Sequence, residues 1–212
     1  MANKLRISHN LIEIAFDSGD APLVAQFYPV HYNRKKTQAK LSIRNLPEVL
    51  KVFRNIDETN ADGLPDNIKK LYWQEMFARR KTDDLLRNGP TKSPVVTEYL
   101  TLKEHQQLGR EIAEVHDRFC FFFDTRTGKT PLSLSIMYDD LQRHPDHKWL
   151  VICPLILIEE AWLEDAAKFV PNLKIVNCHA ATKAKRLKII DKAVADGTQI
   201  FVTNTESFVA YR

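Results

Sequence analysis

The middle of the chain holds residues whose types and spacing suit the binding of phosphate. The segment TGKT, residues 127–130, follows three residues after the apolar run FCFFF, residues 119–123, and precedes apolar residues at helical spacing. A strand, a tight loop and a helix in this order present backbone N–H groups to an anion at the start of the helix. We therefore expect an ATP or GTP site, with Lys129 as the candidate catalytic residue and Thr130 as the Mg²⁺ ligand.

The loop matches part of the full pattern Gly-x-x-x-x-Gly-Lys-[Ser/Thr]. Phe123 stands where the pattern has its first glycine, and Arg126 stands where many such loops have a second one. The expected strand before the loop and the expected helix after it therefore carry the prediction. The candidate nucleotide-binding residues of the loop are Asp124, Thr125, Arg126, Thr127, Gly128, Lys129 and Thr130.

The composition is that of an ordinary globular protein, with 212 residues, 44% of them hydrophobic, and a net charge of +4. Its three cysteines lie in apolar segments without metal-type spacing, which argues against a disulfide scaffold and a zinc site. No apolar run approaches the roughly 18 residues that a membrane span needs, and the N-terminus lacks the apolar core of a signal peptide. We expect a cytoplasmic protein, or a nuclear one in a eukaryote, without a membrane partner.

The second half of the chain alternates expected strands with expected helices. Strands are predicted at residues 119–123, 149–153, 174–177 and 199–202, and helices at 101–116, 130–143, 157–169 and 182–195. A capping box of Thr101 and Glu104 is expected to open the first of these helices. The alternation predicts an α/β fold with a doubly wound parallel sheet, whose ligand lies at the carboxyl ends of the strands.

The first 90 residues have a different pattern, which predicts a small α+β domain. Ile12, Ile14 and Phe16 alternate with other residues as in a half-buried strand, and a helix is expected from Pro47 with Asn45 as its cap. The segment NGPTKSP, residues 88–94, ends a second expected helix. We therefore expect an accessory domain at 1–90, a linker at 91–100 and the α/β lobe at 101–212.

Two stretches of the chain are rich in basic residues. Seven basic residues lie between positions 33 and 54 against the single acid Glu48: Arg34, Lys35, Lys36, Lys40, Arg44, Lys51 and Arg54. They form either a solvated surface or a contact surface for a nucleic-acid backbone. The expected helix at 182–195 is also basic, and for it a solvated face is the default expectation.

Four motifs together resemble the first RecA-like lobe of superfamily-two helicases, particularly the Swi/Snf-like translocases of double-stranded DNA. These motifs are HQ at 105–106, 23 positions before Lys129 (129 − 106), DTRTGKT at 124–130, LVICPLILIEEAWLEDAAKF at 150–169 and IFVTNTESF at 200–208. The resemblance covers about half of the chain. It implies that Gln106 recognises adenine, and that Pro154, Leu155, Thr203 and Asn204 contact DNA.

The resemblance also implies a function: an ATP-dependent helicase or translocase that uses ATP and Mg²⁺ and acts on double-stranded DNA. In such motors an acidic motif and a second RecA-like lobe follow, so we expect this chain to be the N-terminal part of a larger ATPase and not competent in hydrolysis alone. Two alternatives stay open at this point. One is a non-catalytic nucleic-acid-binding or scaffold module with a relic phosphate loop, and the other is a P-loop kinase or NTPase unrelated to DNA.

Overall fold

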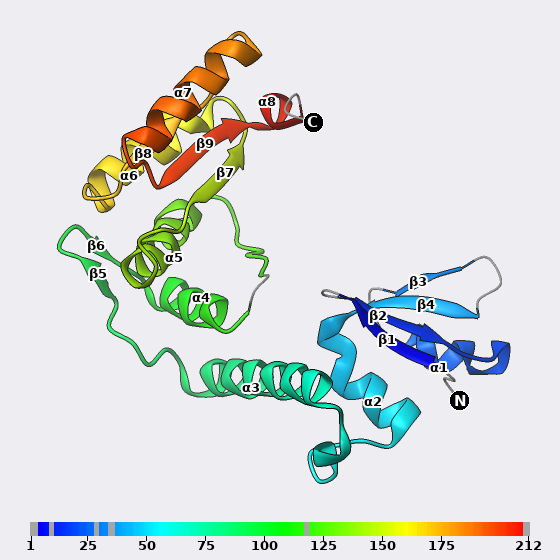
Figure 1. The fold of residues 1–212 in the computed structure, drawn as a ribbon. Coiled ribbons are helices and arrows are strands. Elements are labelled where there is room, and N and C mark those ends of the chain that lie inside the picture. Colours follow the sequence, from blue (N-terminus) through cyan, green and yellow to red (C-terminus); the bar gives the residue numbers. More distant parts are fainter. Residues whose placement is uncertain (1–3, 9–10, 28–29, 34–36, 117–118, 210–212) are drawn as a thin grey trace. The chain divides into compact units, whose positions relative to one another are not determined.

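The computed structural model describes residues 4–8, 11–27, 30–33, 37–116 and 119–209 of the chain (Figure 1). The chain divides into two compact units, Met1–Lys81 and Thr82–Arg212, and each has a hydrophobic core of its own. The division falls inside the long helix α3 (Asp66–Asn88). The linker expected at residues 91–100 holds the short strand β5 and the first residue of β6, and its role as a linker stays a prediction.

The first unit is built on a four-stranded antiparallel sheet with the order β1-β2-β4-β3. Its strands are β1 (Lys4–Ser8), β2 (Leu11–Ala15), β3 (Val30–Tyr32) and β4 (Gln38–Ser42). The alternation predicted around Ile12 and Ile14 is confirmed, since both side chains are buried in β2, and Ala39 and Leu41 are buried opposite them in β4. Two short helices and most of α3 complete the unit: α1 (Ala21–Ala25) and α2 (Leu46–Arg54), with 3-10 turns η1 (Ser18–Asp20), η2 (Ile43–Asn45) and η3 (Ala61–Gly63).

Helix α2 begins where Pro47 predicts it, and the predicted cap position is confirmed, although its side chain does not form the capping hydrogen bond. Asn45 is the N-cap residue and makes no side-chain hydrogen bond to the helix. Because the 3-10 turn η2 precedes α2, the capping hydroxyl belongs to Ser42, which accepts a hydrogen bond from the backbone N–H of Arg44 at 3.3 Å. The guanidinium of Arg79 joins α3 to α2 by binding the carboxylate of Glu48, which lies in α2.

The second unit contains a three-stranded parallel sheet with the order β7-β9-β8. Its strands are β7 (Trp149–Cys153), β8 (Ile175–Asn177) and β9 (Ile200–Asn204), and β5 (Val95–Thr97) and β6 (Leu100–Thr101) form a separate hairpin. Its helices are α4 (Glu104–Glu114), α5 (Lys129–Arg143), the π-helix η4 (Ile158–Leu163), α6 (Glu164–Phe169), α7 (Lys183–Ala195) and α8 (Thr205–Val209). The helices and strands predicted after residue 129 are thus confirmed within a few residues.

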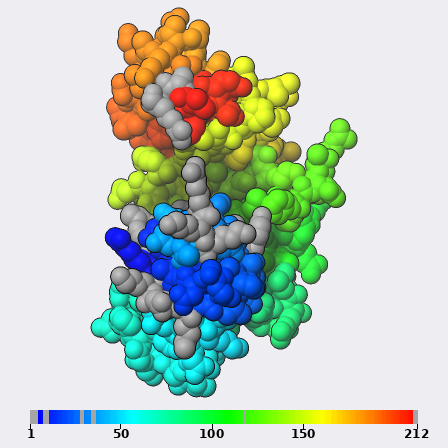
Figure 2. All heavy atoms as spheres, turned by 90° about the vertical axis from the view of Figure 1, so that its right-hand side faces the viewer, coloured from blue at the N-terminus to red at the C-terminus, as the bar shows by residue number. Residues whose placement is uncertain are grey.

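Helices pack against both faces of this sheet. Side chains of α5, η4 and α6 form one core with the inner face of β7 and β9, and α7 packs on the opposite face against Phe201 and Val176. In a space-filling view α7, coloured orange, lies at the surface of the unit (Figure 2). Strand β7 is buried on one face only, since Leu150 and Ile152 are 53% and 43% exposed. The sheet is therefore a mixed α/β layer compatible with a RecA-like lobe, and the larger doubly wound sheet stays a prediction.

The strand predicted at residues 119–123 is wrong. This segment forms no ladder with any strand that the structure describes, and Phe122 is 92% exposed. An apolar run becomes a strand only where another strand offers free N–H and C=O groups. Instead the aromatic rings contact one another, with the centroids of Phe119 and Phe121 4.9 Å apart. Within the described ranges, no helix is long and apolar enough to cross a bilayer.

Candidate nucleotide-binding site

The predicted phosphate loop forms a turn that ends directly in α5. Lys129 is the first residue of this helix and Gly128 is its N-cap residue, with a φ of 81°. Arg126, at the tip of the turn, also has a positive φ, 64°. The first N–H groups of a helix have no partner within it, so the start of α5 offers donors and the positive end of a helix dipole to an anion. The loop therefore lies at a helix N-terminus, the position at which many proteins bind phosphate.

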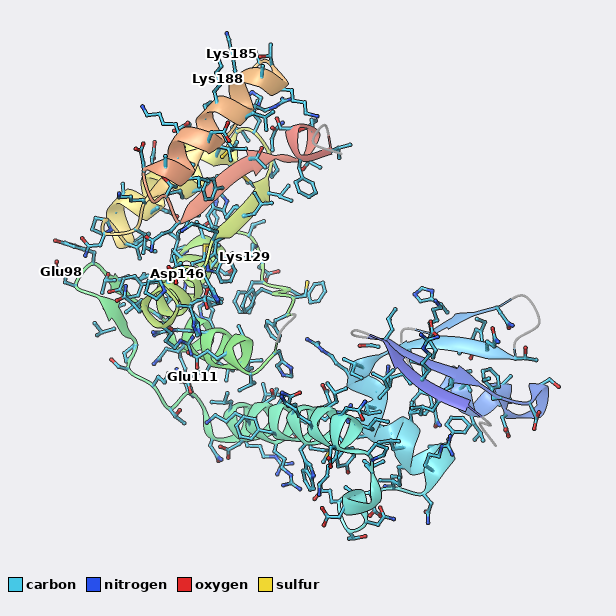
Figure 3. All side chains as sticks on the ribbon, viewed as in Figure 1. Glu98, Glu111, Lys129, Asp146, Lys185 and Lys188 are labelled. Atoms are coloured by element: carbon cyan, nitrogen blue, oxygen red, sulfur yellow. The ribbon has the colours of Figure 1, made fainter. Side chains whose placement is uncertain are left out.

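The ammonium group of Lys129 lies over the first residues of the loop. Its Nζ atom donates hydrogen bonds to the carbonyl oxygens of Phe123, at 2.9 Å, and Asp124, at 2.8 Å. The hydroxyl of Thr127 donates to the same Asp124 carbonyl at 2.7 Å. Figure 3 labels Lys129 at the start of its helix. The lysine side chain is exposed, so an incoming anion can reach its charge.

Gln106 holds the loop from the side of α4. Its Oε1 atom accepts a hydrogen bond from the backbone N–H of Lys103 at 2.8 Å, which caps α4. Its Nε2 atom donates to the carbonyl oxygens of Gly128, at 3.0 Å, and Thr127, at 3.3 Å. The capping box predicted from Thr101 and Glu104 is wrong, because α4 begins one turn later and Gln106 provides its cap. One buried amide thus joins the start of α4 to the phosphate loop.

This contact explains why position 128 is a glycine. A Cβ atom on Gly128 would lie 2.2 Å from Nε2 of Gln106, well inside van der Waals contact. The positive φ adds a second reason, because an L side chain is strained in this conformation. His105 supports the loop at the same place: its Nε2 atom lies 3.2 Å from the Thr127 carbonyl oxygen, and its ring packs edge-on against Phe123.

Behind the loop, α4 and α5 are joined by an ion pair that the sequence did not predict. The Arg110 guanidinium donates two hydrogen bonds of 2.6 Å to the Asp139 carboxylate, and both side chains are largely shielded from solvent. Arg110 lies one turn after Gln106, and Asp139 lies on the helix that Lys129 begins. One residue further on, the buried carboxylate of Glu111 accepts hydrogen bonds from the backbone N–H groups of Thr91 and Lys92. Figure 3 labels Glu111 on α4.

An open cavity of about 530 Å³ lies beside the loop. The end of α3 and the start of α4 line it, including Asn88, Pro90, Glu104 and His105. Since His105 also contacts the loop carbonyl of Thr127, the cavity and the phosphate loop share one wall. Its volume is in the usual range for small-molecule sites.

The structure brings together most of the predicted nucleotide-binding residues. Gln106, Asp124, Thr127, Gly128 and Lys129 are linked by the hydrogen bonds described above. Three others share their backbone segment without a side-chain contact to them among the described interactions: Thr125, Arg126 and Thr130. The binding of a nucleotide by all of these residues stays a prediction.

The predicted nucleic-acid residues lie elsewhere. Pro154 and Leu155 are exposed directly after β7. Thr203 and Asn204 end the neighbouring strand β9, but they are only 1% and 5% exposed. The Oδ1 atom of Asn204 accepts a hydrogen bond from Nδ1 of His179 at 3.0 Å. The predicted contacts of Arg34, Lys35 and Lys36 fall outside the described residues.

The three cysteines are free thiols, of which Cys153 and Cys178 are buried and Cys120 is exposed. Burial raises the pKa of the Cys153 and Cys178 thiols above their usual range, so both stay protonated near neutral pH. Among the described residues, no group of three His, Cys, Asp or Glu side chains could hold a metal ion.

The parallel sheet and the helices on both of its faces define a mixed α/β lobe, in which the loop at residues 124–128 leads into α5. Residues 93–212, more than half of the chain, match the family described as type III restriction enzyme, res subunit. The chain belongs to this family, which confirms the resemblance to superfamily-two helicases.

One solved structure that resembles the chain is the SWI2/SNF2 ATPase core of Sulfolobus solfataricus in complex with dsDNA. The two share 22% sequence identity with a TM-score of 0.41, over 54% of this chain and 23% of that chain. The matched part of this chain thus spans about a quarter of the length of that chain. The comparison with curated proteins found no match.

Proposed function

We propose that the second unit binds ATP with Mg²⁺ and is the nucleotide-binding lobe of an ATP-dependent DNA translocase or helicase of the Swi/Snf-like type. The observation that carries the proposal is the arrangement of Lys129, Gly128 and Gln106 at the start of α5. A cation, a helix N-terminus and a glycine with a positive φ converge on one loop. The family match supports an ATP-dependent helicase-type lobe over a kinase unrelated to DNA.

Lys129 would exchange its hydrogen bonds to two carbonyl oxygens for hydrogen bonds to phosphate when a nucleotide binds. Its ammonium group is held by two neutral carbonyl oxygens, and phosphate oxygens carry negative charge, so charge-assisted hydrogen bonds to phosphate are stronger. The backbone N–H groups at the start of α5 would bind the same phosphates. Thr130 would ligate Mg²⁺, which neutralises phosphate charge. In the complete enzyme Lys129 would then stabilise the charge that develops on the transferred phosphoryl group.

Gln106 would recognise adenine through its Oε1 atom, which can accept one more hydrogen bond. Both N–H donors of Nε2 are directed to loop carbonyls, whereas Oε1 accepts one hydrogen bond and has capacity for a second. The exocyclic amino group of adenine is a donor that fits this oxygen. Guanine has a carbonyl oxygen at the corresponding position, so the same contact would disfavour GTP. The cavity lined by His105 would take the base.

DNA would contact the lobe at the carboxyl edge of the sheet. Pro154 and Leu155 are exposed after β7, and β9 ends beside them in register, with Cys153 opposite Asn204. Restriction enzymes act on DNA, and membership of this family supports DNA as the partner. Movement along DNA driven by hydrolysis belongs to the whole protein, in which a second RecA-like lobe would complete the site.

Titration with Mg²⁺ and a fluorescent ATP analogue tests the nucleotide site. We expect Lys129→Ala to weaken binding at least tenfold, since a charge-assisted contact is worth about 1.5–3 kcal/mol. Lys148→Ala is the matched control, because Lys148 is an exposed lysine just before β7, at the opposite edge of the sheet. Equal affinity in the wild type and Lys129→Ala would show that the loop is not the nucleotide site.

A further inference from the structure

Helix α7 carries a row of lysines on its outer face. Lys185, Lys188 and Lys192 are three and four residues apart, the spacing that places side chains on one side of a helix. All three are exposed, and no carboxylate in the described parts of the chain forms an ion pair with them. Figure 3 labels Lys185 and Lys188, whose side chains point away from the lobe. We name these three residues the α7 lysine row.

The helix dipole does not favour the cations at the start of α7. The first turn has no acidic residue, and Lys183, Lys185 and Arg186 lie at the positive end of the dipole. Cations are disfavoured there by about 0.3–1 kcal/mol each, whereas Lys192 in the last turn lies at the end where the dipole favours a cation. Helix stability therefore does not account for Lys185, and an anionic partner would offset its cost.

Arg186 fixes the start of α7 to the carboxyl edge of the sheet. Its Nη1 atom donates to the carbonyl oxygen of Ala180 at 3.2 Å and to the hydroxyl of Ser207 at 3.1 Å. Ser207 lies in α8, directly after β9, and its hydroxyl also lies 3.3 Å from His179 Nδ1. The row is therefore held on a rigid surface that begins at the edge where Thr203 and Asn204 end β9.

We propose that the α7 lysine row binds the phosphate backbone of double-stranded DNA. From Lys185 to Lys192 the helix rises about 10 Å, seven residues at about 1.5 Å each. One strand of a duplex carries a phosphate about every 3.4 Å along the axis, so about three phosphates face the row. Long, flexible lysines suit contacts to phosphate that do not depend on base sequence. This inference rests on the proposed function and specifies a surface for its DNA partner.

The salt dependence of DNA binding tests the proposal. The variant Lys185→Ala/Lys188→Ala/Lys192→Ala removes the row while keeping good helix formers. We expect its affinity for a duplex of random sequence to fall at least tenfold at low salt. The slope of log affinity against log salt should become shallower by about 0.9 for each lost phosphate contact, close to 3 in all. The matching triple Lys→Arg variant should keep most of the slope, because it keeps the charges.

A second triple variant controls for net charge alone. Lys70→Ala/Lys148→Ala/Lys168→Ala removes the same charge from exposed lysines outside α7, and should leave the slope within about one contact of the wild type. Three results would overturn the proposal: equal slopes in the row variant and the wild type, equal losses in both triple variants, or no duplex binding by the wild type at low salt. Loss of binding to phosphatidylserine vesicles with unchanged DNA binding would also contradict it.

The same samples separate this inference from the proposed function. The row lies outside the phosphate loop, so the row variant should bind Mg²⁺ and ATP like the wild type. If Lys129→Ala weakens ATP binding but the row variant binds DNA with the wild-type affinity and salt slope, the inference fails and the ATP site stands. If Lys129→Ala binds ATP normally, the proposed nucleotide site fails, whatever the lysine row does.

Discussion

The Nε2 atom of Gln106 lies 3.0 Å from the carbonyl oxygen of Gly128, and the same amide caps its own helix through Lys103. The phosphate loop and the start of α4 are therefore mechanically linked by one side chain that is 5% exposed. Substitutions at the two residues should therefore have non-additive effects on the unfolding free energy and on ATP binding, which a double-mutant cycle measures.

Gly128→Ala should disrupt the loop for two reasons that can be separated. The new Cβ would approach Nε2 of Gln106 to 2.2 Å, and the positive φ of 81° would strain any L side chain by about 1–2 kcal/mol. We expect at least tenfold weaker ATP binding and a lower unfolding free energy in urea.

In Gly128→Ala/Gln106→Ala the steric part should disappear while the backbone strain persists. The losses of the two single variants should therefore sum to more than the loss of the double variant. Strict additivity would show that the new methyl group at position 128 does not contact the Gln106 amide in solution.

Arg126→Gly should stabilise the loop. Arg126 has a φ of 64°, which costs a non-glycine residue about 1–2 kcal/mol, whereas added freedom of glycine in the unfolded chain costs about 0.4–1 kcal/mol. A net gain of about 0.5–1 kcal/mol in unfolding free energy follows. Arg126→Ala is the control, since alanine keeps the strain and should change stability little. A gain of the same size in the alanine variant would assign the effect to the lost charge.

Arg110→Ala should be strongly destabilising because it leaves the Asp139 carboxylate buried without its partner. Removal of one member of a buried ion pair costs about 3–5 kcal/mol, and denaturation in urea measures it. Replacement of both residues, as Arg110→Met/Asp139→Leu, should recover most of the loss. If the double variant is as unstable as the single one, the ion pair is not the source of the effect.

The buried thiols should make stability fall at alkaline pH. Burial raises the folded pKa of Cys153 above the usual value of 9.0, so the folded chain keeps a proton that the unfolded chain releases. This contribution is complete below the unfolded pKa and is lost as the pH rises toward the folded pKa. Cys178 behaves in the same direction. The unfolding free energy of Cys153→Ala/Cys178→Ala should therefore decline less steeply than that of the wild type between about pH 8 and pH 10. Parallel curves would contradict the assignment.

The sequence predicted those parts of the fold that local pattern determines. Apolar residues at helical spacing located α5, and Pro47 marked the first turn of α2. The HQ motif at residues 105–106 predicted a role for Gln106 at the site, although it did not predict the contact with Gly128. The family match confirms the resemblance on which this reasoning rested.

Other features depend on packing that no local pattern records. Residues 119–123 are apolar enough for a strand, but a strand also needs a partner, and the described strands offer none to this segment. Arg110 and Asp139 look like ordinary solvated charges in sequence, and only the packing of α4 on α5 shows them as a pair. Thr203 and Asn204 end β9 only 1% and 5% exposed, which their sequence does not indicate, and their contact with DNA stays a prediction.

A comparison of ATP, ADP and AMP tests the central claim most directly, because Lys129 is proposed to reach the outer phosphates. In the wild type with Mg²⁺ we expect ATP and ADP to bind at least tenfold more tightly than AMP, and Lys129→Ala to remove most of this difference. If the wild type binds the three nucleotides with equal affinity, or if Lys129→Ala retains the full preference, the loop at residues 124–130 is not a phosphate site.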